Sequence, residues 1–145
     1  MFNSHVIKNP EIIITRKDFR VVVAKADILV EGNDEDAILR DNVIADFFDD
    51  LGQHMSILYS DSARFNQKNN NLYAMGNVFV VSDSGYTLST KSIMWDNQYK
   101  LIESQDSVMF TTPEKDTMYG IGFESDMDLS EWKIYKPKGV SGKGF

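Results

Sequence analysis

Residues 76–90, GNVFVVSDSGYTLST, combine two short runs of alternating apolar and polar residues with a tight Ser-Asp-Ser-Gly turn between them. Alternation with a period of two is typical of a strand with one buried face, and valine is a residue that strands favour. A turn of Asp, Ser and Gly between two such runs predicts a β-hairpin. This stretch makes an all-β fold the first expectation.

The pair that opens this hairpin recurs along the chain as a weak internal repeat. Asn42-Val43, Asn77-Val78 and Ser107-Val108 follow one another at steps of 35 and 30 residues, and each opens a short apolar segment that leads to a turn. Similar units at a regular spacing indicate stacked supersecondary structure with a common core. We therefore expect an antiparallel sheet of stacked hairpins, with an apolar interior and end strands that can pair with another chain.

The segment at 36–52, DAILRDNVIADFFDDLG, allows two interpretations. A helix would be capped by Asp36 and ended by Gly52, and it is favoured by the four-residue spacing of Leu39, Val43, Phe47 and Leu51. Alignment of the segment with GNVFVVSDSG favours a strand and hairpin instead. We favour the strand, keep the helix as the alternative, and expect return strands at 54–65 and 86–95.

Composition indicates one folded domain. The chain has 145 residues, 42% of them hydrophobic, which is enough to build a core without crosslinks. Its apolar runs are far shorter than the roughly 20 residues that a membrane-spanning helix needs. We expect an irregular lead-in at 1–10, a single β domain at 11–140 and a loose tail at 141–145, with turns at 31–36, 66–71 and 113–116.

Charge and residue usage argue against several classes of function. A formal net charge of −7 disfavours nucleic acid as a partner, because phosphate backbones are bound by clustered Lys and Arg. The absence of cysteine excludes disulfides and thiolate metal sites. The two histidines, His5 and His54, do not have the spacing of metal ligands. We therefore expect neither a metal nor another cofactor.

Acidic residues are the main candidates for catalysis. A carboxylate pair for glycoside hydrolysis could come from either of two groups, Asp46, Asp49 and Asp50 or Asp126, Asp128 and Glu131. Both groups lie in or beside expected turns, where such runs are usually solvated. The sequence contains no G-x-S-x-G elbow and no complete dinucleotide fingerprint. We expect a protein that is not an enzyme.

Three segments together resemble the LptC family, the periplasmic component of the lipopolysaccharide export machinery of Gram-negative bacteria. They are VIADFFDDLGQHMSILYSDSA at 43–63, GNVFVVSDSGYTLSTKSIMWDNQYKLIESQDSVMF at 76–110 and GIGFESDMDLSEWKIYKPKG at 120–139. The likeness covers roughly residues 21–139. Its strongest elements are the Gly-Asn-Val turn, the Thr-x-x-x-x-Trp-Asp segment and the closing G-x-G-F-x-S with Pro-x-Gly.

The resemblance implies a twisted antiparallel β-jellyroll of the OstA-like type, open at both ends, whose trough binds the acyl chains of lipid A. It also implies that the N-terminal edge meets an LptBFG-type ABC transporter and that the C-terminal edge pairs with an LptA-like bridge protein, so that lipopolysaccharide passes on for outer-membrane assembly. The implied localisation is periplasmic, with anchoring to the inner membrane by a segment that this chain lacks.

Site residues follow from strand alternation, in which a slip of one residue would invert a whole strand. In 118–123, MYGIGF, we expect the two glycines to face away from the trough and to mark a close backbone approach. The expected trough residues are Val43, Phe47, Leu58, Leu72, Val78, Val80, Leu88, Trp95, Ile102, Val108, Phe110, Tyr119, Ile121, Phe123 and Ile134. The expected partner edges lie within 12–23 and 132–138, at Ile12, Ile13, Ile14, Val21, Val23, Trp132, Ile134, Tyr135 and Lys136.

A second class of function fits the same fold. The trough could be a filled core, and the protein a non-catalytic β-repeat module for interaction or carbohydrate binding. Exposed aromatic residues would then form a sugar-stacking face, with Tyr73, Phe79, Tyr86 and Tyr99 as candidates. Open strand edges also allow an edge-to-edge homo-oligomer.

Overall fold

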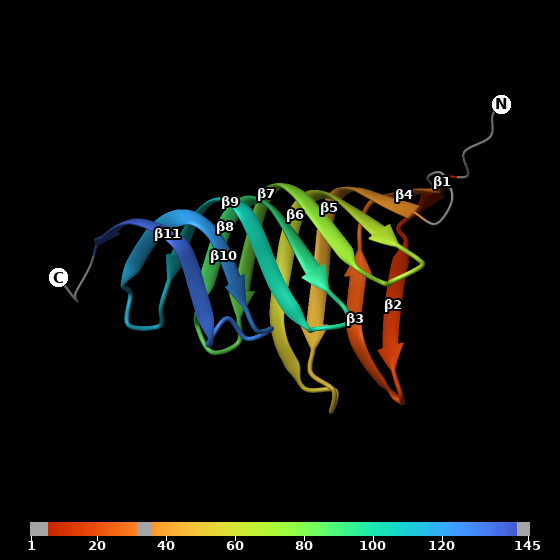
Figure 1. Ribbon diagram of the computed structural model, residues 1–145. Coiled ribbons are helices and arrows are strands. Elements are labelled where there is room, and N and C mark those ends of the chain that lie inside the picture. Colours follow the sequence, from red (N-terminus) through yellow and green to blue (C-terminus); the bar gives the residue numbers. More distant parts are fainter. Residues whose placement is uncertain (1–5, 32–35, 142–145) are drawn as a thin grey trace.

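The computed structural model describes residues 6–31 and 36–141, and within them it contains strands and turns but no helix (Figure 1). The all-β class is therefore confirmed. Much of the turn expected at 31–36 lies outside the described residues, as do residues 1–5 of the lead-in, with His5 among them, and 142–145 of the tail.

The strands form one antiparallel sheet of 11 strands. Their bounds are β1 Val6–Lys8, β2 Glu11–Arg16, β3 Phe19–Lys25, β4 Ile28–Glu31, β5 Asp36–Phe48, β6 His54–Asn66, β7 Leu72–Ser82, β8 Thr87–Asp96, β9 Leu101–Thr111, β10 Thr117–Ser125 and β11 Trp132–Ser141. The segment with two interpretations is thus a strand, β5, because its residues alternate between the buried core and solvent. The turns expected at 66–71, 82–85 and 113–116 are present.

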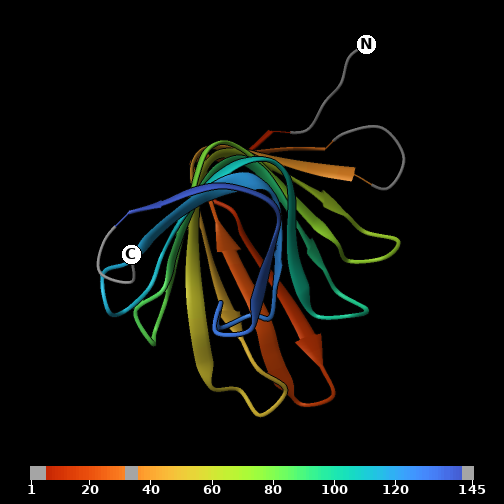
Figure 2. The ribbon, with the colours of Figure 1, turned by 60° about the vertical axis from the view of Figure 1, so that its left-hand side comes forward.

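The sheet folds over into a trough with two walls (Figure 2). The first half of β5 pairs with β4, through Leu29 and Leu39, while its second half pairs with β3, through Val22 and Phe47. The strands from β5 to β10 share this division, because each pairing in the series shifts register near its middle. We call the side with β1 and β4 wall A, and the side with β2 and β3 wall B.

The corner between the walls explains the internal repeat. Asn42 and Asn77 have φ angles of 54° and 48°, in the left-handed region that asparagine tolerates better than most residues. Each side-chain amide donates to a nearby aspartate at 2.8 Å, Asn42 to Asp27 in the break between β3 and β4, and Asn77 to Asp61 on β6. The Asn-Val pair therefore marks the bend in the middle of a strand. The expectation that it opens a strand is wrong, because the ladder continues on both sides of the bend.

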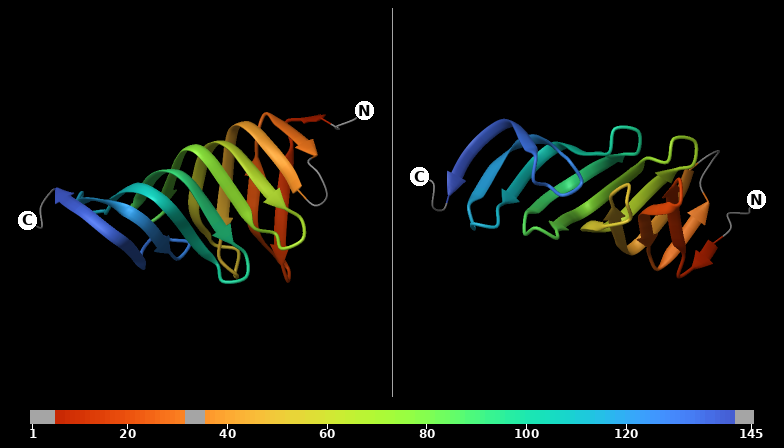
Figure 3. Two further views of the ribbon diagram at one scale, coloured as in Figure 1. Left: turned by 45° about the horizontal axis from the view of Figure 1, so that its top comes forward. Right: turned by 90° about the horizontal axis from the view of Figure 1, so that it is seen from below.

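The strands lie side by side along the trough, so the two ends of the chain lie at opposite ends of the molecule (Figure 3). At the C-terminal end, β11 pairs only with β10 and is an edge, as expected. At the N-terminal end the edges are β1 in wall A and β2 in wall B. Two expectations were wrong here. Residues 6–8, expected in the irregular lead-in, form a strand. Val21 and Val23, expected at a partner edge, lie in β3, which is paired on both sides.

A bulge in β10 inverts part of the expected facing. Gly122 has a φ of 86°, and the register between β9 and β10 shifts between Ile121 and Phe123. A bulge adds one residue to a strand and so reverses the alternation on one side of it. Phe123 therefore faces the core as expected, but Tyr119 is 42% exposed and Ile121 faces outward beside Lys136. The inward assignment of Tyr119 and Ile121 was wrong.

Candidate functional site

The interior of the trough is apolar and holds most of the residues expected there. Each of the following has no more than 4% of its surface exposed: Val43, Phe47, Leu58, Leu72, Val78, Val80, Leu88, Trp95, Ile102, Val108, Phe110 and Phe123. Ile134 is partly buried against them. The polar residues buried among the described residues are serines, and none is charged. This interior suits hydrocarbon and offers no ionisable group for acid–base chemistry.

Aromatic residues connect the two walls across the trough. The rings of Phe47 in wall B and Trp95 in wall A lie 5.7 Å apart, centre to centre. Further along, the Phe110 ring lies 5.1 Å from Phe123 and 4.8 Å from Trp132. Such contacts contribute about 0.5–1.5 kcal/mol per pair beyond the burial of area. The trough is therefore closed in this structure, and its interior is packed as a core.

The connection between β10 and β11, residues 126–131, fills the open side of the trough between the walls (Figure 2). Leu129 is fully buried in the core, and the Trp95 Nε1–H donates to the sulfur of Met127 at 3.0 Å. On the wall B side, the Ser84 hydroxyl donates to Asp128 at 3.0 Å. We call this segment the plug. Sequence reasoning missed it because its acidic residues predict a solvated turn, although Met127 and Leu129 alternate with them.

A cluster of charged and polar side chains joins the walls across the same open side. Arg16, at the end of β2 in wall B, donates to Asp50 at 2.9 Å and to the backbone oxygen of Asn97, in wall A, at 2.7 Å. Lys100, also in wall A, pairs with the other oxygen of Asp50. Both cations lower the pKa of Asp50, the lysine more strongly. We call Arg16, Asp50, Asn97 and Lys100 the seam latch.

A cavity of about 320 Å³ lies directly behind the seam latch. Its polar rim contains Arg16, Asp50 and Lys100. Its apolar lining comes from both walls and from the plug: Val21, Phe48, Leu51, Trp95 and Met127. The volume is at the lower limit for a small-molecule pocket. The cavity therefore combines charged side chains with an apolar lining from both walls and the plug.

His54 holds together three segments of wall B. Its Nδ1 lies 2.7 Å from Asp83 in the β7–β8 turn, and its Nε2 lies 2.8 Å from Asp46 in β5. The ring also contacts the edge of Phe48, 5.2 Å away between centres. Burial opposes the charged imidazole, but the hydrogen bonds to Asp83 and Asp46 outweigh it and raise the pKa of His54. Both aspartates thus have a structural role.

A second, larger cavity of about 760 Å³ lies toward the C-terminal end of the sheet, from β6 to β11. Its lining includes the outward-facing Tyr73, Glu103 and Tyr135. Burial and the nearby Glu124 raise the pKa of Glu103. Glu124 accepts a hydrogen bond of 2.6 Å from the Tyr135 hydroxyl and raises the pKa of that tyrosine. The lining also includes the core residues Ala74, Ile93 and Phe123, so this cavity combines outward-facing polar groups with part of the apolar core.

The remaining candidates do not form a common site. Tyr73 stacks under Arg64 on wall A, and Phe79 is exposed on wall B. Tyr86 packs on Phe110, and Tyr99 lies in the β8–β9 turn. The expected sugar-stacking face is therefore not assembled. Among the acidic candidates, Asp49 and Asp126 accept hydrogen bonds from backbone N–H groups of their own turns.

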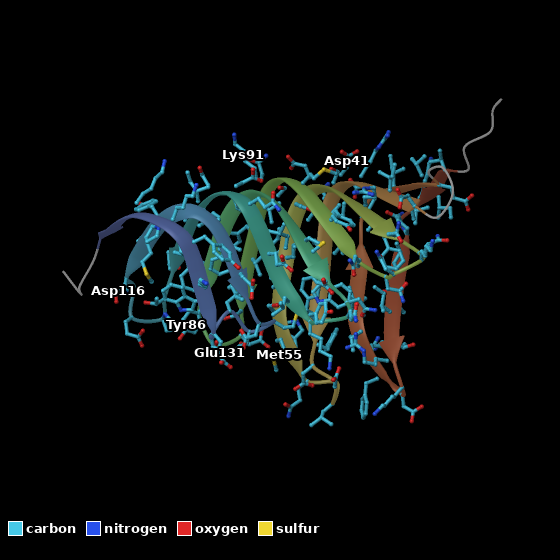
Figure 4. All side chains as sticks on the ribbon, in the orientation of Figure 1. Asp41, Met55, Tyr86, Lys91, Asp116 and Glu131 are labelled. Atoms are coloured by element: carbon cyan, nitrogen blue, oxygen red, sulfur yellow. The ribbon has the colours of Figure 1, made fainter. Side chains whose placement is uncertain are left out.

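Figure 4 shows which labelled side chains lie on the closed side of the molecule and which lie on the side opposite to it. Asp41 and Lys91 lie at the corner, on the closed side, whereas Met55, Tyr86 and Glu131 lie on the opposite, lower side in this view. In the part of the chain that the structure describes, no three His, Cys, Asp or Glu side chains are grouped as metal ligands.

Comparisons with known proteins agree with this architecture. Residues 23–139 match a family model described as lipopolysaccharide-assembly, LptC-related. A search of curated proteins found no match. Over the described residues, no helix is long and apolar enough to cross a membrane.

Proposed function

Because the chain belongs to the LptC-related family of lipopolysaccharide-assembly proteins, and so takes part in lipopolysaccharide transport, we propose that its trough binds the acyl chains of lipopolysaccharide between the two walls. The observation that supports this proposal is the continuous apolar interior, which runs under the strands from β2 to β10 without a buried charge among the described residues. Acyl chains need apolar area and no directional chemistry. Binding requires the walls to separate. They can do so by bending at the corner that they share, because the strands have bulges there and a sheet bends at bulges.

The proposal extends to the two ends of the sheet. Lipopolysaccharide arrives from the inner-membrane ABC transporter at the N-terminal end, where β1 and β2 have unpaired edges. It leaves toward an LptA-like bridge protein at the C-terminal end, where the partner continues the sheet along β11. The protein acts in the periplasm, held at the inner membrane. Strand addition at both ends would make one continuous trough from three proteins.

Photocrosslinking to lipopolysaccharide tests the trough. Val80 and Val81 are neighbours on β7, and only Val80 is fully buried in the interior. A photoreactive residue at Val80 should crosslink to lipopolysaccharide, whereas one at Val81 should not. Ile121, on the outer face of β10, is a second negative control. Equal crosslinking at Val80 and Val81 would contradict binding in the trough.

A second candidate function is a scaffold with a permanently filled core. The close contacts of Phe47 with Trp95 and of Phe110 with Phe123 favour it, because they leave the interior packed. This function predicts no crosslink to lipopolysaccharide at Val80 in a protein that circular dichroism shows to be folded. A crosslink from Lys136 on β11 to the bridge protein is expected under both functions, so it tests the edge separately.

A further inference from the structure

The seam latch and the cavity behind it form a site whose ligand can be inferred from its chemistry. The latch joins elements that are distant in the sequence, since Arg16 is 34 residues from Asp50 and 81 from Asn97. It is a place where wall A and wall B meet across the open side of the trough, through the ion pair of Lys100 with Asp50 and the hydrogen bond from Arg16 to Asn97.

The latch is built to open at low energetic cost. The side chains of Arg16, Asp50 and Lys100 retain 26%, 45% and 44% of their exposed surface. Ion pairs as exposed as these contribute only about 0.2–1 kcal/mol each, because solvent screens them. The aromatic contacts deeper in the trough, such as that of Phe47 with Trp95, are buried and are not screened in this way. The latch closes the entrance but does not hold the fold together.

The polar and apolar parts of the site point to an amphiphile with a negatively charged head. Two cations share one carboxylate, that of Asp50, at the rim. The other carboxylates of the two turns are engaged locally, since Asp49 accepts from Leu51 and Gln53 and Asp96 accepts from Gln98 and Tyr99. Apolar side chains lie directly behind the rim. A phosphate group can replace the Asp50 carboxylate, because Arg and Lys bind both.

We propose that this is the lateral entrance of the trough, where a phosphate on the head of a lipid takes the place of Asp50 on Arg16 and Lys100 while an acyl chain passes beside Trp95 and Met127. This inference rests on the proposed function and adds a site, a ligand group and a trigger for opening. In the closed state the Asp50 carboxylate is paired with Arg16 and Lys100. In the open state the lipid phosphate occupies them, and the β5–β6 turn is released from the β8–β9 turn.

The fluorescence of Trp95 reports on this site, because the indole lines the cavity. The chain has two tryptophans, so Trp132→Phe leaves Trp95 as the only one. This background is titrated with three probes: bisphosphorylated lipid A, lipid A from which both phosphates have been removed, and inorganic phosphate. Three variants are compared in it, namely Asp50→Asn, the double variant Arg16→Gln with Lys100→Gln, and Lys91→Gln.

The expected results differ for each variant. Asp50→Asn keeps the shape of the side chain but frees the cations, so phosphorylated lipid A should bind about two- to fivefold more tightly. The double variant should bind it about tenfold more weakly, through loss of the charge-assisted bonds to phosphate. Lys91→Gln removes a cation at the corner, away from the seam, and should change nothing. Dephosphorylated lipid A should bind no more weakly to the double variant than to the unsubstituted protein, because it has no phosphate contact to lose, and inorganic phosphate alone should leave the fluorescence unchanged.

Two outcomes would overturn the inference while leaving the proposed function intact. One is that the ratio of the affinities for phosphorylated and dephosphorylated lipid A is the same in the unsubstituted protein and in all variants, which would mean that lipid enters elsewhere. The other is a response to inorganic phosphate equal to that of lipid A, which would indicate a plain anion site. If neither form of lipid A binds the unsubstituted chain or any variant, both the inference and the trough function are wrong.

Discussion

Replacement of Leu129 gives a sharp test of the plug as a structural element. Leu129 is fully buried, and its backbone has a φ of 62°. Shortening a buried leucine to alanine costs about 2–5 kcal/mol of unfolding free energy, from lost burial and the cavity left behind. We expect Leu129→Ala to lower the unfolding free energy by about 3 kcal/mol. Although Leu129 lies in an acidic turn, it should thus behave as a core residue.

The positive φ angle adds a second expectation. A side chain in the left-handed region costs about 1–2 kcal/mol, which glycine avoids. Glycine loses about 0.5–1 kcal/mol through its flexibility in the unfolded chain. Leu129→Gly should therefore be more stable than Leu129→Ala by up to about 1.5 kcal/mol, the reverse of the usual order. Urea unfolding followed by tryptophan fluorescence measures both, and with a slope of about 2 kcal/mol per M the alanine variant should shift the midpoint by about 1.5 M.

The control is Leu51→Ala, in the β5–β6 turn, where the side chain is 71% exposed. This substitution should change the unfolding free energy by no more than about 0.5 kcal/mol. The reasoning would be refuted if Leu129→Ala were as mild as Leu51→Ala, since the plug would then not be packed. A glycine variant less stable than the alanine variant would refute the backbone part alone.

Three further predictions concern separate parts of the molecule. The folded pKa of His54 is raised above its unfolded value near 6.5, so the stabilisation that His54 gives is fully present below pH 6.5 and is lost as the pH rises through the folded pKa. The melting temperature of the unsubstituted protein should therefore fall over this pH range, and that of His54→Gln should not. Parallel pH profiles for the two proteins would contradict this prediction. A Cβ at Gly120 would lie 2.3 Å from the Ile134 side chain and 2.8 Å from the Lys136 backbone oxygen. In urea unfolding, Gly120→Ala should therefore lower the unfolding free energy by about 1–3 kcal/mol. Gly139→Ala is the control and should not lower it, because a Cβ there has nothing within 4 Å. Val80→Arg should abolish crosslinking of lipopolysaccharide to a probe at Phe110 if the fold survives by circular dichroism, and unchanged crosslinking would place the lipid elsewhere.

Local patterns predicted the strands and most of the turns, because alternation and turn residues act over a few positions. Residues 76–90 form the expected hairpin, with Gly85 at a φ of 101° in its turn. Residues 36–48 could not be assigned from local pattern alone, since apolar residues spaced by four fit a helix as well as a bent strand. Only pairing with β3, β4 and β6 decides between them.

The errors came from features that depend on partners far along the chain. The Val6–Lys8 strand exists because β4 pairs with it. The facing of Tyr119 and Ile121 was inverted by the bulge at Gly122, which alternation does not reveal. The seam latch could not be predicted, because the contact of Arg16 with Asn97 joins the end of β2 to the β8–β9 turn, 81 residues away. The trough residues on β5 to β9 were predicted correctly in their burial, because two-residue periodicity is undisturbed within each half strand.

The two ends of the sheet are unequal, and this gives the molecule a polarity. The C-terminal end is one strand, β11, of 10 residues that runs over both walls. The N-terminal end is divided into β1 and β2, of 3 and 6 residues, because the break at Ala26 and Asp27 separates β3 from β4. A partner at the C-terminal end can add a single bent strand, whereas one at the N-terminal end has to supply two strands or an interrupted one. Joining two copies end to end would be a heterologous contact that does not close on itself. The proposed assembly through these ends would therefore be directional, because each end can accept a different kind of strand.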